Sequence, residues 1–145
     1  MPQTPPPEPS AAPRSQAPKF VLIGEDDIDD QELFTEIFDT VKENVELRFA
    51  KSGLEILQYL ENCQGKDLPC LIILDYNMPE LNGAEILEKL REKKEYDHIP
   101  KIIWSTSGSK VFREKSLEFG ANAYIIKPSN VNELKEVASY MLSYC

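Results

Sequence analysis

From residue 19 onward, the chain alternates between short apolar runs and longer stretches in which apolar residues recur at helical spacing. Apolar runs of about four to six residues are typical of strands, whereas repeats at i, i+3 and i+4 are typical of amphipathic helices. In the first unit, Phe20 to Ile23 form such a run, and Phe34, Ile37 and Val41 follow at helical spacing. We expect strands at 20–23, 45–50, 71–74, 101–105 and 123–127, and helices at about 33–41, 54–60, 82–90, 110–119 and 131–142.

This alternation predicts a fold class. Residues 71–74, Leu-Ile-Ile-Leu, form the most hydrophobic run, which is typical of a central strand buried on both faces. Residues 45–50 alternate apolar and polar side chains, as an edge strand does. Five strands in strict alternation with helices predict a parallel sheet covered by helices on both faces. The element lengths favour a doubly wound α/β fold of flavodoxin-like type, (βα)5, with strand order 2-1-3-4-5.

Residues that begin or end helices fall between these elements. Ser52 is a suitable N-cap for the second helix, and Asn82 with Gly83 opens the third. Gly120 follows the fourth helix, at the position where glycine commonly ends a helix in the left-handed backbone conformation.

The first 18 residues differ in composition from the rest. They hold seven of the eleven prolines and no aromatic residue, so they cannot bury enough surface to fold. We expect a disordered Pro-rich tail at 1–18 and one domain at 19–145. The tail lacks the continuous apolar core of a secretory signal. Two roles remain open for it, a linker or a docking segment for an aromatic groove.

Charge and hydropathy exclude two classes of partner. Glu8 and Arg14 cancel within the tail, so the net charge of −9 belongs to residues 19–145. An acidic domain is poorly suited to bind the nucleic acid backbone. No run approaches the roughly 18 apolar residues that a membrane span needs. We therefore expect a cytoplasmic protein with neither nucleic acid nor membrane as a partner.

The three cysteines, Cys63, Cys70 and Cys145, show neither CxxC nor metal-ligand spacing. Their odd number favours reduced thiols, as in a cytosolic protein, with Cys70 buried as a small hydrophobic residue.

Polar residues that can carry chemistry follow directly after four of the five apolar runs. The carboxyl ends of parallel strands meet at one edge of the sheet, so these residues are expected to share one pocket. Carboxylates a few ångströms apart repel by about 4 kcal/mol per pair at an effective dielectric near 20. All-oxygen ligands select a hard cation, Mg²⁺ or alternatively Mn²⁺. The residues concerned are Glu25-Asp26-Asp27, Asp75, Ser105-Thr106 and Lys127-Pro128.

Such a pocket is suited to accept a phosphoryl group. A bound divalent ion can neutralise the charge that develops during in-line transfer. A carboxylate oxygen of Asp75 can act as the nucleophile. The ammonium of Lys127 and the hydroxyl of Ser105 can each bind another phosphoryl oxygen. No other cofactor is indicated.

Four segments, FVLIGEDD, LIILDYNMPELNG, IIWSTS and AYIIKP, resemble the receiver domain of two-component response regulators. The resemblance extends from Phe20 to about Leu142. It implies that Asp75 is the phosphoacceptor and that Glu25 and Asp26 are the acidic pair, with Asp26 a direct metal ligand. It also implies that the backbone carbonyl of Asn77 is the third protein ligand of the metal.

The resemblance assigns three further roles. Ser105 matches the switch hydroxyl, Tyr124 the switch aromatic residue and Lys127 the lysine of the family. The Lys127–Pro128 peptide bond is expected to be cis by the same analogy. The neighbouring acids Asp27, Asp29 and Asp30 are interpreted instead as N-terminal acids of the first helix.

Two residues depart from the family pattern. Gly24 stands where an apolar strand residue is usual and is expected to loosen packing beside the acidic pair. Thr106 replaces the small residue that commonly follows the switch hydroxyl, which puts the lifetime of the phosphoryl group in doubt.

The function expected from this resemblance is that of a stand-alone response regulator, not an enzyme beyond its own phosphorylation and dephosphorylation. A histidine kinase or phosphotransfer protein would be the donor. No output module follows the last helix, so the output would be a separate protein, a phosphorelay transfer or a homodimer. One alternative is a degenerate receiver that acts as a protein-binding scaffold. A less favoured one is a metal-dependent phosphohydrolase, which would usually place an acid where Asn77 stands.

Overall fold

Five parallel strands form one sheet in the order β2-β1-β3-β4-β5 in the computed structural model, which describes residues 19–41, 44–63 and 67–145. The predicted doubly wound fold and strand order are therefore confirmed. The tail expected at 1–18 lies outside the described residues. The strands are β1 (Lys19–Gly24), β2 (Val45–Ala50), β3 (Leu71–Asp75), β4 (Lys101–Ser105) and β5 (Ala123–Ile126).

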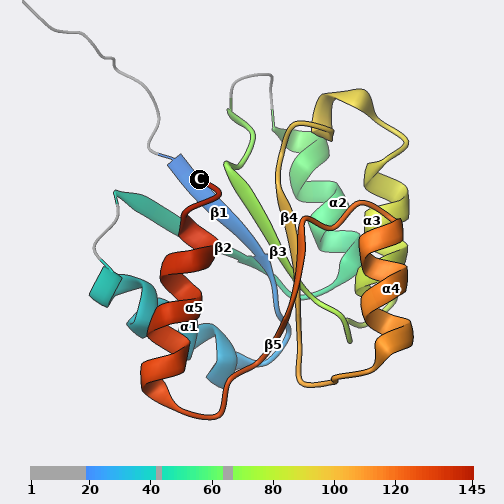
Figure 1. Cartoon of the computed structure of the whole chain (residues 1–145). Helices are drawn as coiled ribbons and strands as arrows, with labels where there is room; N and C mark the ends of the chain where they lie inside the picture. The colour runs from blue at the N-terminus through green and yellow to red at the C-terminus, as the bar shows by residue number, and fades with distance from the viewer. Residues whose placement is uncertain (1–18, 42–43, 64–66) are drawn as a thin grey trace, which may run out of the picture.

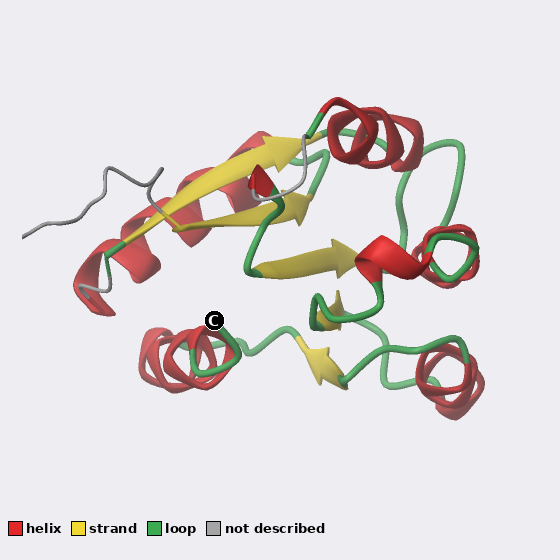
Figure 2. Ribbon diagram, turned by 90° about the horizontal axis from the view of Figure 1, so that it is seen from above, coloured by secondary structure: helices red, strands yellow, loops and turns green. Residues whose placement is uncertain are grey.

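Helices cover both faces of the sheet, as Figures 1 and 2 show. Two helices, α1 (Ile28–Val41) and α5 (Val131–Leu142), pack on one face and contact each other. No helix in the described part of the chain is long and apolar enough to cross a membrane. The opposite face carries α2 (Gly53–Asn62), α3 (Gly83–Leu90), α4 (Lys110–Glu118) and the 3-10 helix η3 (Lys94–Tyr96).

The central strand β3 contributes to two hydrophobic cores, one on each face of the sheet. Ile72 and Leu74 pack toward α2 and α3, whereas Leu71 and Ile73 pack toward α1 and α5. All four side chains are fully buried. Burial of each stabilises the fold by roughly 1.5–3 kcal/mol, so this strand holds the end that carries Asp75 firmly in place.

The helix-boundary residues act as predicted. Ser52 caps α2, because its hydroxyl accepts the backbone N–H of Glu55. Asn82 forms a capping box with Glu85 at the start of α3. Gly120 adopts a φ of +108° just after α4, a conformation that a residue with a Cβ rarely adopts.

Two expectations for residues beside the predicted pocket are wrong. Gly24 does not loosen the packing: a Cβ there would lie 2.8 Å from Met78 Cε and 3.2 Å from Leu74 Cδ2, because these side chains already fill the space. The Lys127–Pro128 bond is trans, since the described chain contains no cis peptide bond. With this bond in the trans form, the backbone nitrogen of Lys127 still donates to the carbonyl oxygen of Ser105 at a distance of 2.7 Å.

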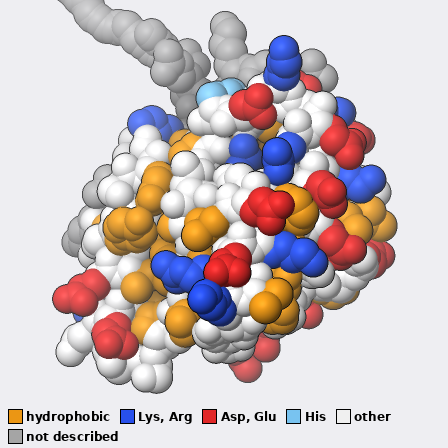
Figure 3. Space-filling model, turned by 45° about the vertical axis from the view of Figure 1, so that its right-hand side comes forward, with side chains coloured by type: hydrophobic (Ala, Val, Ile, Leu, Met, Phe, Trp, Pro, Cys, Tyr) orange, Lys and Arg blue, Asp and Glu red, His pale blue; other side chains and the backbone are white. Residues whose placement is uncertain are grey.

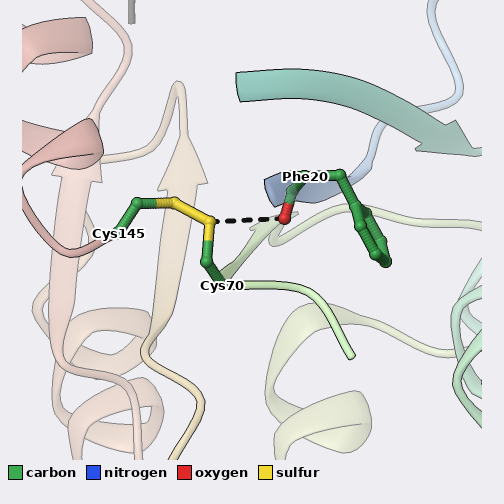
Figure 4. Close-up of a disulfide and its surroundings, with 3 residues drawn as sticks. All are labelled: Phe20, Cys70 and Cys145. Carbon is green, nitrogen blue, oxygen red and sulfur yellow. Dashed lines mark hydrogen bonds between the residues drawn. A yellow bond between two sulfur atoms is a disulfide. The ribbon is translucent and has the colours of Figure 1, made fainter. Parts of the chain in front are cut away.

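The cysteine prediction is also wrong. Cys70 and Cys145 form a disulfide with a Cα–Cα distance of 5.0 Å, and Cys70 is half-buried rather than buried. The two residues are 75 positions apart, and the fold brings them together because the end of α5 lies beside the start of β1 and β3 (Figures 1 and 4). Cys63 is a free thiol, as predicted.

Gly83, the first residue of α3, lies against the backbone that follows β3. A Cβ at this position would lie 3.1 Å from Tyr76 Cα, 3.3 Å from the Asp75 carbonyl oxygen and 2.9 Å from the side chain of Ile103. We therefore expect Gly83→Ala to lower the free energy of unfolding by about 1–3 kcal/mol in a urea titration.

Gly108→Ala is the matched control. The nearest side-chain atom to a Cβ there is 3.5 Å away, an ordinary contact distance. This variant should change the free energy of unfolding by about 0.5 kcal/mol or less. Equal urea midpoints for the Gly83 and Gly108 variants would contradict the close packing of α3 against the end of β3.

Candidate functional site

A pocket of about 600 Å³ lies at the carboxyl edge of the sheet, beyond the ends of β1 and β3. These two strands are adjacent in the sheet but not consecutive in the chain, which makes this edge the topological switch point, where doubly wound folds bind ligands. The pocket is strongly acidic. Its lining residues are Glu25, Asp26, Asp27, Ile28, Asp29, Asp30, Asp75, Asn77, Thr106 and Lys127.

The ammonium of Lys127 lies among three carboxylates. Its Nζ atom is 2.7 Å from Asp75 Oδ2, 3.1 Å from Asp30 Oδ2 and 3.3 Å from Glu25 Oε1. The Lys127 side chain is only 14% exposed and Glu25 is 1% exposed, so solvent screens these interactions weakly. The sheet thus brings together Glu25, Asp75 and Lys127, although Glu25 and Lys127 are 102 positions apart in the sequence and Asp75 and Lys127 are 52 apart.

Local backbone geometry orients the two central groups. Asp75 is the last residue of β3, and its Oδ1 atom accepts the backbone N–H of Asn77 at 2.9 Å, which leaves Oδ2 for Lys127. Lys127 follows β5, and its Nζ lies 5.7 Å from the centre of the Trp104 ring. Trp104 is buried and packs against Phe34 of α1 beside the site.

The clustered charges shift two pKa values. Burial, with a further contribution from the Asp75 charge, raises the pKa of Glu25 to about 7 although Lys127 acts in the opposite direction. Burial alone would lower the pKa of Lys127, but the hydrogen bond and charge of Asp75, the charge of Glu25 and the hydrogen bond to Asp30 raise it well above its usual range. Near neutral pH, the metal-free pocket therefore holds an ammonium and a carboxyl group that is partly protonated.

Three carboxylates of this pocket converge closely enough to hold a cation. Glu25, Asp30 and Asp75 each offer an oxygen atom, and these atoms lie within 4.8 Å of one another. Oxygen ligands of this kind suit a hard divalent ion, so the residues fit the expected metal. Two other expected ligands, Asp26 and Asn77, also line the pocket and are exposed, and the Asp26 carboxylate lies outside this group of three.

Asp30 is the site residue that the sequence interpretation missed. It was assigned to helix capping, but Asp27 has that role: its Oδ1 atom accepts the backbone N–H groups of Asp29 and Asp30 at 2.8 and 3.2 Å. The Asp30 side chain is thereby left to bind Lys127 from the first turn of α1. The position of Asp30, three residues after the cap, could have indicated its role in the site, because that position lies on the helix face next to the strand ends.

Ser105 and Tyr124 do not line the pocket, and both form a hydrogen bond with Ser107. Ser105 is the last residue of β4 and is fully buried, and its hydroxyl accepts the Ser107 N–H at 3.0 Å. Tyr124 is buried, and its hydroxyl donates to the Ser107 carbonyl at 2.6 Å. Ser105 does not line the pocket, whereas the exposed Thr106 does. The loop after β4 therefore connects the expected switch hydroxyl with the expected switch aromatic residue.

The model of one protein family, the response regulator receiver domain, matches residues 21–139. The chain belongs to this family. Receiver domains of this kind are signalling phosphoacceptors of two-component systems rather than classical enzymes. The match covers every described element from β1 to most of α5.

Individual relatives agree with this assignment. The response regulator Rcp1 of Synechocystis is 28% identical over 133 residues, which cover 90% of both proteins. A chemotaxis protein CheY homolog of Campylobacter jejuni is 42% identical over 66 residues, so the matched part of this chain spans 51% of that protein. The sensor histidine kinase TmoS of Ectopseudomonas mendocina is 31% identical over 94% of this chain, although that is only 14% of TmoS. The same unit therefore also occurs within histidine kinases.

Solved structures show the same receiver fold. The Mn²⁺-bound form of Rcp1 superposes with a TM-score of 0.75 at 29% identity, over 87% of this chain and 93% of that one. The phosphorylated cyanobacterial phytochrome response regulator RcpA gives a TM-score of 0.78 at 27% identity, over 89% and 97% of the two chains. The acidic pocket of this receiver domain fits the divalent-metal binding of the family.

Proposed function

We propose that this receiver domain, at 19–145 after the Pro-rich tail 1–18, acts as a response regulator in which Asp75 accepts a phosphoryl group in the presence of Mg²⁺ or Mn²⁺. The observation that carries the proposal is the 2.7 Å contact between Asp75 and Lys127 inside a pocket where Glu25 and Asp30 converge. The Mn²⁺-bound Rcp1 and phosphorylated RcpA structures, which share this fold, support it.

Each residue has a defined task in the transfer. A carboxylate oxygen of Asp75 attacks phosphorus in line, an O–P bond forms, and the bond to the donor nitrogen of a phosphohistidine breaks as that nitrogen regains a proton. Lys127, already bound to Asp75 Oδ2, can follow the charge to a phosphoryl oxygen. Glu25, Asp30 and Asp75, whose oxygen atoms converge, would hold the divalent ion together with Asp26 and the carbonyl of Asn77, which also line the pocket. The ion would supply neutralisation of the phosphoryl charge.

Phosphorylation would be transmitted through Ser107. If the Ser105 hydroxyl turns to donate to a phosphoryl oxygen, it gives up the Ser107 N–H, and the carbonyl of the same residue is the acceptor for Tyr124. The affected surface comprises α4, β5 and α5, where Val111, Ile126 and Tyr140 are all exposed by about half or more. Figure 3 shows the side that carries α4, on which apolar side chains are interspersed with acidic and basic ones. Interspersed apolar and charged groups suit a protein partner.

The partners follow from the family and from the charge. A histidine kinase or a phosphotransfer protein is the donor, and a downstream protein or a second copy of the chain receives the signal. The net charge of −9 disfavours nucleic acid as a partner. We place the protein in the cytoplasm, with no membrane partner.

The decisive experiment is intact-mass analysis after incubation with acetyl phosphate and Mg²⁺. The wild-type protein should gain one phosphoryl group, because Asp75 and Lys127 are already in contact. Asp75→Asn should gain none, and EDTA should prevent the gain by wild type. Asp97→Asn, which changes an exposed aspartate outside the pocket, is the matched control and should be modified like wild type.

Two outcomes would overturn the proposal. Equal modification of Asp75→Asn and wild type would place the phosphoryl group on another residue. No adduct on any variant, with Mg²⁺ binding intact and with a histidine kinase phosphodonor also tried, would leave a phosphorylation-independent scaffold as the function.

A further inference from the structure

The disulfide between Cys70 and Cys145 lies at the opposite end of the sheet from the phosphoacceptor pocket. Cys70 directly precedes β3 and Asp75 ends this strand, so the two are roughly 16 Å apart along the extended chain. Cys145 follows α5, and the chain end lies beside the start of β1 in Figure 1. The disulfide and the pocket therefore share no residue, and each can be tested separately.

The disulfide links the end of α5 to the sheet. Beyond Leu142, the backbone hydrogen bonds of the described residues are all local to the end of α5: Ser143 N–H donates to Ser139 and Tyr140, Tyr144 N–H to Met141, and Cys145 N–H to Leu142. Tyr144 and Cys145 are half-buried against the core between the sheet and α1 and α5. Such a short final turn frays readily, so the covalent link to Cys70 restrains this segment in addition to its packing against the core.

The surroundings of Cys70 suit the reduced state as well as the oxidised one. The carbonyl oxygen of Phe20 accepts the Cys70 backbone N–H at 2.9 Å, and the Cys70 sulfur lies 3.4 Å from the same oxygen (Figure 4). A carbonyl oxygen has two lone pairs, so a Cys70 thiol would donate its hydrogen to this oxygen without any rearrangement. Reduction therefore leaves no polar group of Cys70 unpaired.

We propose that Cys70 and Cys145 form a reversible thiol–disulfide exchange site that fixes or frees the C-terminal end of α5. The reductant is a low-molecular-weight thiol such as glutathione. One thiolate attacks a sulfur of the pair to give a mixed disulfide and one protein thiolate, and a second thiolate then attacks the mixed disulfide. The protein disulfide gains two electrons and two protons, and two glutathione molecules become one glutathione disulfide.

An effect of the thiol state on function rests on the proposed response-regulator role. The α5 helix forms part of the proposed output surface, with Tyr140 exposed and hydrogen-bonded to Tyr144 between their hydroxyl oxygens at 3.0 Å. Freeing Cys145 would loosen this pair while leaving Asp75 and Lys127 in place. The thiol state would then modulate partner binding without changing phosphoryl acceptance.

The first experiment counts free thiols. The folded protein is equilibrated with glutathione buffers of increasing reducing strength, quenched in acid, denatured, alkylated with N-ethylmaleimide and weighed. We expect one labelled thiol (Cys63) under oxidising conditions, three under reducing conditions, and full return on reoxidation. If the pair remains oxidised in excess reduced glutathione until denaturant is added, or if glutathione disulfide never restores it, the exchange site is refuted.

The second experiment locates the effect. Reduction should increase amide hydrogen exchange from Leu142 to Cys145 by a larger factor than in β3, and should lower the melting temperature by on the order of 10 °C. Cys145→Ser should match the reduced protein in every buffer, whereas Cys63→Ser should respond like wild type. Exchange that rises equally throughout the sheet would contradict a local release of α5.

Phosphorylation is the independent readout. The gain of one phosphoryl group from acetyl phosphate should be the same in the oxidised and reduced proteins. Failure of phosphorylation in both states would overturn the proposed function and leave the thiol result intact. A redox-dependent yield would show that the disulfide acts on the pocket itself and would contradict the separation proposed here.

Discussion

Lys127→Met should lower the free energy of unfolding by about 3–5 kcal/mol in EDTA at pH 8, and saturating Mg²⁺ should recover most of that loss. The side chain is 14% exposed and contacts three carboxylates, so its removal leaves Glu25, Asp30 and Asp75 facing one another without a counter-charge. The loss should be smaller at pH 5, because Lys127 lowers the pKa of Glu25 and its absence favours the protonated form of that carboxyl group. Urea titrations at the two pH values, with and without Mg²⁺, measure both effects.

Lys101→Met is the matched control, because it removes another buried lysine. Lys101 is 8% exposed and donates to the carbonyl of Tyr96 at the far end of β4, where burial lowers the pKa of its ammonium. Its replacement should give the same stability difference from wild type with and without Mg²⁺. If Lys127→Met behaved in the same metal-independent way, the three carboxylates would not form a cation site.

The convergence of Asp75 and Lys127 was predictable because it depends on the alternation of strands and helices alone. In a parallel sheet, the residue that follows each apolar run lies at the same edge, whatever the details of the loops. The ends of β3 and β5 could therefore be read from the runs LIIL and AYII. Ser105 also stands at a strand end, opposite Ile126 in the register of β4 and β5, but its buried side chain does not line the pocket as expected, and Thr106 does.

Features that depend on single backbone conformations were not predictable. The sequence does not distinguish Asp27, Asp29 and Asp30, because all three are aspartates near the start of the same helix. Asp27 is the cap because the local backbone conformation brings its carboxylate to two N–H groups. That choice decides which carboxylate remains to bind Lys127. The space above Gly24 is similarly filled by Met78, whose position depends on the loop after β3.

The disulfide shows the same limit over a longer range. Disulfide formation requires a short Cα–Cα distance and Cβ atoms that point toward each other, and the spacing of two cysteines in the sequence specifies neither. The two cysteines are 75 residues apart in the sequence: Cys70 directly precedes β3, and Cys145 follows α5. The packing of α5 on the sheet, with its end beside the start of β1 and β3, brings them to a Cα–Cα distance of 5.0 Å.

Glu25→Gln should remove a pH dependence that the metal-free wild-type protein shows between about pH 4.5 and pH 7. Burial raises the pKa of Glu25 from 4.5 to about 7 in the folded state, so within this window the unfolded chain has lost its proton while the folded protein keeps it. Folding is then coupled to the uptake of a proton, so the free energy of unfolding falls as pH rises. The fall amounts to about 3 kcal/mol in total and levels off above pH 7. Glutamine cannot ionise, so the variant should lack this decline and be more stable than wild type at pH 8 in EDTA.

Urea titrations in EDTA from pH 4 to pH 8 test this expectation, with Asp26→Asn as the matched control. Asp26 is the adjacent carboxylate but is exposed, so its replacement should retain the decline. Mg²⁺ binding to wild type should release a proton below pH 7, because the ion and the proton compete for the Glu25 carboxylate, and its apparent affinity should therefore rise with pH up to about 7. A decline that persists in Glu25→Gln would assign the buried proton to another carboxyl group of the pocket. A decline that disappears only in this variant would show that the resting pocket holds its proton where the metal is to bind, so that metal binding and deprotonation of Glu25 are one event.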